Sequence, residues 1–253
     1  MNEQNPPPPV PPIIPTAGNK PNQLGDDPAE RMPIPNFIAA IECVLRHPRR
    51  VMFQLREPGA GKLIGALLFI SIACSLAYGA VVGSFSGGMQ WWAAPVKIAG
   101  GLLISALICL PSLYIFASLS GAKVRLAELF GLVAGLLTLM TVLLIGFAPV
   151  AWIFSQSTES LAWMGFLHLM FWFIATAFGL RFLQVGFSHA QAKSNAGFFV
   201  WVIIFMLVML QMTTALRPLI GTSESFLPKT KQFFLAHWSE CVSQSEHGGR
   251  NRD

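Results

Sequence analysis

Residues 56–63, with the sequence REPGAGKL, form the first segment whose residue types could do chemistry. Backbone amides of a Gly-rich loop can hold phosphate, but the phosphate-binding loop has the pattern GxxxxGK followed by Ser or Thr. Arg56 occupies the position of its first glycine, and Leu63 follows Lys62. The pattern therefore argues against a nucleotide site. It predicts a flexible joint at the two glycines, with Lys62 anchored among lipid headgroups.

Three polar side chains inside apolar sequence are candidates for a working site at membrane depth: His168, Arg181 and Gln211. Ionisable residues at this depth often lie on substrate pathways or proton relays. For His168 a hydrogen bond to a neighbouring helix is the favoured interpretation, and Arg181 can extend its guanidinium to the interface. No carboxylate lies deep in an apolar run, which argues against a carboxylate-based proton or sodium relay.

The sequence contains no pattern typical of catalysis or metal binding. The motifs GxSxG and HExxH are absent, as are paired carboxylates in apolar surroundings. Four cysteines lie far apart without a CxxC pair, which favours structural thiols over disulfides or a zinc site. They are Cys43, Cys74, Cys109 and Cys241. We therefore expect a protein that is not an enzyme and has no catalytic residue, metal or cofactor.

The composition predicts that lipid is the solvent of most of the chain. Of 253 residues, 53% are hydrophobic and 11% are charged, whereas a soluble domain has about 25% charged residues. So few charges could not cover this apolar surface in water. The net charge is +5, and the basic residues adjoin apolar runs rather than alternate with aromatic residues. This pattern favours anionic lipid headgroups as a partner and argues against nucleic acid.

Five apolar runs are long enough to cross a bilayer as helices, which need about 20 residues. Backbone polar groups in lipid must be bonded within their own segment, so helices are required. The sequence predicts an all-α, polytopic membrane helical bundle with about five transmembrane helices over residues 63–216. The runs are 63–85, 98–119, 129–154, 162–187 and 197–216.

Small and aromatic residues indicate how the predicted helices pack and where they end. Small residues at GxxxG spacing allow close helix packing in lipid. Tryptophans flanking the runs are typical of an interfacial belt. The small pairs are Gly79 with Gly83, Gly131 with Gly135, and Ala175 with Gly179; the tryptophans are Trp91, Trp92, Trp152 and Trp163.

Both ends of the chain differ from the apolar middle. Residues 1–34 contain PPPPVPPIIP and predict a disordered tail with polyproline II stretches, which could dock a protein partner. Residues 35–62 predict a basic amphipathic segment lying along the membrane surface. Residues 217–253 predict a polar tail with a short helix. The basic residues expected to bind anionic headgroups are Arg46, Arg49, Arg50, Arg56 and Lys62.

The distribution of Lys and Arg predicts the topology. Basic residues precede the first run and lie between the second and third and between the fourth and fifth, whereas the loop SQSTES has none. The positive-inside rule then places the N-terminus in the cytoplasm. With five spans the C-terminus lies outside, although basic residues in the C-terminal tail oppose this. We expect an integral protein of the bacterial cytoplasmic membrane, and the sequence leaves oligomerisation open.

Two segments carry a resemblance to a known family: residues 47–58 (HPRRVMFQLREP) and residues 110–137 (LPSLYIFASLSGAKVRLAELFGLVAGLL). With LRPLIG at 216–221, they resemble bacterial members of the YIP-domain superfamily of multi-pass membrane proteins. Of the eukaryotic signature Asp-Leu-Tyr-Gly-Pro only Leu113 and Tyr114 are present, so trafficking roles are not implied. The resemblance covers about residues 36–221 and implies a five-span membrane protein without known chemistry.

Two functions follow from these features. The first is a non-enzymatic scaffold or regulatory component that recruits partners through the Pro-rich N-terminus and the basic surface segment. The alternative is a small transporter or channel subunit, which His168, Gln211 and the kinks expected at Pro111 and Pro149 favour.

Overall fold

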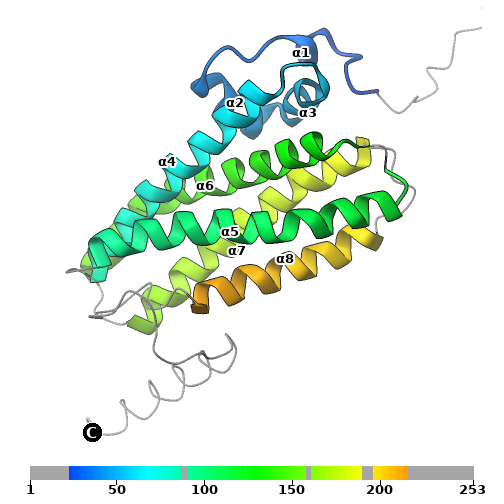
Figure 1. The fold of residues 1–253 in the computed structure, drawn as a ribbon. Coiled ribbons are helices and arrows are strands. Elements are labelled where there is room, and N and C mark those ends of the chain that lie inside the picture. The colour runs from blue at the N-terminus through cyan, green and yellow to red at the C-terminus, as the bar shows by residue number, and fades with distance from the viewer. Residues whose placement is uncertain (1–22, 87–89, 123, 158–160, 190–195, 216–253) are drawn as a thin grey trace, which may run out of the picture.

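The computed structural model describes residues 23–86, 90–122, 124–157, 161–189 and 196–215, and these residues are helical apart from short connections. Five long helices form an antiparallel bundle, and three short ones cover one of its ends (Figure 1). The helices are α1 (Pro28–Arg31), α2 (Phe37–Arg46), α3 (Pro48–Arg56), α4 (Gly61–Ser86), α5 (Gln90–Leu119), α6 (Leu126–Ser157), α7 (Leu161–His189) and α8 (Ala196–Ala215). The predicted tail at 217–253 lies outside the described residues.

The prediction of an all-α membrane bundle is confirmed. Within the described residues, four helices are long and apolar enough to cross a bilayer, over Gly61–Ser84, Trp91–Leu119, Leu126–Ser157 and Trp163–His189. The fifth predicted run forms α8, whose apolar part, Ala196–Met212, is shorter. Helix α5 begins at Gln90, well before the predicted start of its run at residue 98, so it includes Lys97.

Helix α6 forms the centre of the bundle. In its most apolar window 72% of the residues are buried, against 33–39% in the other three candidate spans. It packs against α4 on one side and α7 on the other, while α5 packs against α4 and α8. The buried hydroxyl of Thr138 on α6 lies 2.8 Å from the carbonyl of Leu67 on α4. The surrounding helices therefore separate α6 from lipid.

Glycines allow the helices to approach closely, as the small-residue spacing predicts. A Cβ at Gly79 would lie 2.4 Å from the Cα of Pro95, so the backbones of α4 and α5 are in contact there. A Cβ at Gly135 would lie 2.6 Å from the ring of Phe182 on α7. Because little hydrophobic force draws helices together in lipid, this close packing is what holds the bundle.

Residues 23–56, which we call the cap, cover the ends of α4 and α6 (Figure 1). Helix α2 begins after Asn36, whose side chain accepts a hydrogen bond from the Ala39 amide at 2.8 Å, and Pro48 opens α3. Leu55 of α3 fills the notch at Gly131 of α6, where a Cβ would lie 2.5 Å from its Cδ2. The cap and the bundle therefore share one apolar core. Its cap members are Ala40, Cys43, Val44, Val51, Met52 and Leu55.

The structure has a turn between two helices at the joint predicted from REPGAGKL, and its folded part begins earlier than predicted. Helix α3 ends at Arg56, Gly59 adopts a positive φ of 99°, and α4 begins at Gly61. The tail predicted over residues 1–34 is too long, because residues 23–34 include α1 and are hydrogen-bonded to α3. Composition could not reveal that side chains of α3 bind this segment.

Replacing Gly79 by Ala should loosen the bundle. The added methyl group would meet the backbone of α5, so α4 and α5 must separate, and overpacking of this kind costs about 1–3 kcal/mol. The control is Gly146→Ala on α6, where a Cβ meets nothing within 4 Å. Unfolding by sodium dodecyl sulfate in mixed micelles, followed by circular dichroism, measures both variants. Equal stability of the two variants would contradict the α4–α5 contact.

Candidate functional site

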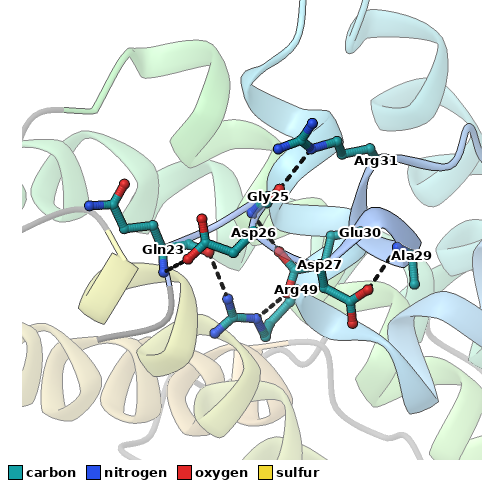
Figure 2. Close-up of polar contacts among 8 residues, drawn as sticks. All are labelled: Gln23, Gly25, Asp26, Asp27, Ala29, Glu30, Arg31 and Arg49. Atoms are coloured by element: carbon teal, nitrogen blue, oxygen red, sulfur yellow. Dashed lines mark hydrogen bonds and ion pairs between the residues drawn. The ribbon is translucent and has the colours of Figure 1, made fainter. Parts of the chain in front are cut away.

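The segment 23–34 is fixed to α3 by a polar network that we call the clasp (Figure 2). Glu30 is buried, and its carboxylate accepts hydrogen bonds from the Gly25 amide at 2.5 Å and from the Arg49 guanidinium. A second guanidinium nitrogen of Arg49 donates to the Gln23 carbonyl at 3.1 Å. Arg31 donates to the Gly25 carbonyl at 2.7 Å. One carboxylate thus organises both the turn before α1 and the first turn of α3.

The clasp continues along α3 through two further side chains. Arg50 donates to the carbonyls of Met32 at 2.9 Å and Pro33 at 2.8 Å. Gln54 donates to the Met32 carbonyl and accepts from the Ile34 amide at 3.3 Å. Residues 32–34 lie outside any helix or sheet, so their peptide groups form hydrogen bonds with side chains of α3 instead.

A second ionic cluster joins the cap to the bundle. Glu128 lies near the start of α6, and its Oε1 is 2.9 Å from Nε of Arg125. Its Oε2 is 3.9 Å from Nε of Arg56, at the end of α3. Arg56 also donates to the carbonyl of His189 at the end of α7, at 2.9 Å. Arg125 donates to the Arg56 carbonyl at 2.8 Å. Together these contacts connect three helix ends.

The five basic residues predicted to bind headgroups therefore have different surroundings. Arg49, Arg50 and Arg56 form hydrogen bonds inside the protein. Arg46 is exposed and lies 3.7 Å from Glu42 one helical turn away, and Lys62 is exposed at the start of α4. Binding of headgroups by these residues stays a prediction, with Arg46 and Lys62 the most accessible of the five.

The bundle contains a buried hydrogen bond between two helices that both pack on α6. The hydroxyl of Tyr78 on α4 lies 2.7 Å from Nδ1 of His168 on α7, and the two rings meet edge to face. Tyr78 is fully buried, and His168 is 6% exposed. Among the described residues, the buried Nε2 of His168 has no hydrogen-bond partner. The alternative of a helix–helix hydrogen bond is therefore confirmed for Nδ1, while Nε2 stays available to a ligand.

Lys97 is a buried cation on α5 that sequence reasoning missed. It is 2% exposed, although it lies within a candidate span. The predicted run begins at residue 98 and so does not include Lys97. The available signal was its position five residues after Trp92, which matches the position of His168 five residues after Trp163.

Tyr78, Lys97 and His168 form what we call the polar layer, near the end of the bundle away from the cap. Trp92 and Trp163 are exposed at this end, as expected for an interfacial belt. At 1.5 Å per residue, Lys97 and His168 each lie about 7.5 Å deeper than the tryptophan that precedes them. The layer therefore lies about one and a half helical turns inside the tryptophans that are expected to mark the membrane interface.

The three predicted intramembrane candidates, His168, Arg181 and Gln211, do not lie together in one site. Arg181 is exposed on α7, thirteen residues beyond His168 and thus about 20 Å away along the helix. Gln211 lies near the end of α8, and its buried Oε1 has no partner among the described residues. Tyr78 was also missed, since a tyrosine in an apolar run gives no signal of its own.

Metal ligands are not clustered in the described part of the chain. No group of three or more His, Cys, Asp or Glu residues lies close enough there to hold a metal ion. Cys43, Cys74 and Cys109 are free thiols, and Cys241 lies outside the described residues. Burial raises the pKa of the Cys43 thiol, so this cap cysteine stays protonated.

Acid should open the clasp. Burial would raise the pKa of Glu30, but the hydrogen bonds from Arg49 and the Gly25 amide, with the charge of Arg49, outweigh burial and hold the pKa below its ordinary value. The stabilisation is therefore complete above pH about 4.3, the ordinary pKa of Glu, and is lost as the pH falls through the lower pKa of the folded state. Hydrogen exchange of the Gly25 amide, corrected for intrinsic rates, should report this loss.

Two variants make the acid experiment specific. Glu30→Gln should reduce the protection of Gly25 about tenfold or more at neutral pH, because a hydrogen bond to a charged group contributes about 1.5–3 kcal/mol. Asp27→Asn is the control, because Asp27 caps α1 through the Ala29 amide and makes no described contact with Arg49. Protection that does not change in Glu30→Gln would show that the clasp does not depend on Glu30.

Comparison with known proteins gives no relative for this chain. No protein-family model, no curated protein and no solved structure matches it. The resemblance to bacterial YIP-domain proteins therefore stays a prediction, and the function has to be argued from the geometry.

Proposed function

We propose that the protein is a non-enzymatic integral membrane scaffold or regulatory component, which recruits a protein partner through its Pro-rich N-terminal sequence. The observation that carries this proposal is the clasp, because it attaches the chain to α3 directly after that sequence. Proline-rich segments dock in aromatic grooves of partner domains at low entropic cost. A fixed attachment point holds such a segment at high effective concentration beside the membrane.

The distribution of charge supports a cytoplasmic position for the cap. Cations gather at the cap end of the bundle, where they include Arg46, Arg49, Arg50, Lys62 and Arg125. Exposed tryptophans mark the other end. By the positive-inside rule, the cap and the Pro-rich sequence then face the cytoplasm of a bacterial cell. The resemblance of residues 36–221 to bacterial YIP-domain proteins agrees with this assignment.

Replacing the prolines of residues 6–15 by Gly and Ser should abolish recruitment and leave the membrane bundle intact. A photoreactive residue placed in this segment would be crosslinked in native membranes, and the partner would be identified by mass spectrometry. The matched control replaces residues 16–22 by Gly and Ser at the same length. If the partner bound equally in both variants, or if the unsubstituted segment gave no specific adduct, recruitment through the Pro-rich sequence would be wrong.

The alternative, a small transporter or channel subunit, is favoured by the polar layer. Buried polar groups in a span are costly and commonly serve a solute or ion. Tyr78 and His168 join α4 to α7, and Nε2 of His168 is available to a ligand. Lys97 at the same depth would favour an anionic or hydrogen-bond-accepting solute.

A flux assay in liposomes tests the alternative. If the layer binds a solute, His168→Leu should change the flux of that solute at least tenfold, and Tyr78→Phe should change it less, because it keeps the ring. Arg181→Gln is the control, since Arg181 is exposed on the other half of α7. Equal effects of Arg181→Gln and His168→Leu, or no flux of anions and small metabolites, would remove this function.

A further inference from the structure

A groove of about 650 Å³ lies where the cap meets the start of α4. This volume is within the range of small-molecule sites, which is about 300–1,000 Å³. One wall comes from α1, α2 and α3, and the other from the first two turns of α4. Residues that bear on its chemistry are Arg31, Phe37, Glu57, Lys62, Leu63 and Ala66.

The groove opens at the level where the membrane begins. Leu63 and Ala66 belong to the first turns of a candidate span, whereas Arg31 and Gln54 of the clasp line the groove on the cap side. The ring of Phe37 on α2 lies 5.3 Å from the ring of Phe69 on α4. Both rings are more than half exposed, and Ile38 beside them is 77% exposed. An apolar surface therefore continues from the groove into the region of the acyl chains.

The charged side chains of the groove indicate which polar group a ligand would carry. The exposed side chains of Arg31 and Lys62 supply two cations, and Glu57 supplies one carboxylate. Two cations attract a phosphate. The carboxylate can accept a hydrogen bond from a hydroxyl group of the same ligand, but it would repel a second negative charge.

We propose that this groove binds an anionic phospholipid whose headgroup carries hydroxyl groups, such as a phosphatidylglycerol. Arg31 and Lys62 bind the phosphate, Glu57 accepts a headgroup hydroxyl, and an acyl chain lies along Phe37 and Phe69. The occupant is a membrane lipid because the ligand must be charged at one end and apolar at the other. The proposal does not depend on recruitment through the Pro-rich sequence, since its partner is a lipid. It shares one residue with the clasp, Arg31, which also donates to the Gly25 carbonyl.

Native mass spectrometry of the full-length protein in detergent tests the proposal with dioleoylphosphatidylglycerol as the probe. The doubly substituted variant Arg31→Gln/Lys62→Gln should bind this lipid about 30-fold more weakly, because each cation contributes about fivefold near an anionic headgroup. Ala66→Trp should also prevent binding, because the indole would fill the groove. Arg181→Gln, which removes an exposed cation on α7 that does not line the groove, should bind normally.

Further measurements distinguish binding of an anionic lipid from binding of any lipid or of free phosphate. Phosphatidylcholine should bind at least tenfold more weakly than phosphatidylglycerol, and millimolar inorganic phosphate should not displace the lipid, because phosphate lacks the apolar part. An unchanged melting temperature without lipid would show that the variants are folded. Equal losses in Arg181→Gln and in the double variant would reduce the effect to general surface charge and overturn the proposal, as would equal binding of the two lipids.

Discussion

The fold depends on how closely helices can approach one another in a solvent that does not drive them together. In hydrocarbon, contact has to come from shape, so the positions without a side chain decide which helices pair. Gly79 brings the backbone of α4 against α5, and Gly135 receives Phe182 of α7. Gly131 receives Leu55 and so extends the same packing from the membrane into the cap. The glycine contacts determine which helices pair, and polar contacts stabilise the resulting arrangement further.

The two ends of the bundle differ in the kind of polar chemistry they hold. At the cap end, guanidinium groups satisfy carboxylates and backbone carbonyls, as in the pair of Arg49 with Glu30. At the other end, a hydrogen bond joins the side chains of Tyr78 and His168, deeper in the bundle than the exposed tryptophans. Most arginines of the cap therefore hold the protein together, and fewer are left for headgroups than a count of basic residues suggests.

Hydropathy and spacing predicted the helices well because each helix in lipid is determined by its own segment. The five runs correspond to α4–α8, and the small residues Gly79, Gly131 and Gly135 lie at helix contacts as expected. Contacts between distant segments could not be predicted this way. The clasp joins residues 23–34 to α3 across about twenty positions, and Tyr78 meets His168 across ninety. Lys97 was missed because the predicted run begins after this charge, at residue 98, whereas α5 begins at Gln90.

The central position of α6 has a consequence for biosynthesis. Among the long helices of the described residues, α4 and α5 precede α6 in the chain, so they enter the bilayer before the helix that α4 packs against most extensively. Before α6 is inserted, contact with α5 at Gly79 and Pro95 shields part of α4 from lipid. The carbonyl of Leu67 has no bond from the Thr138 hydroxyl at this stage. Nascent chains that end before residue 126 should thus contain a hairpin of α4 and α5 without the packed core around α6.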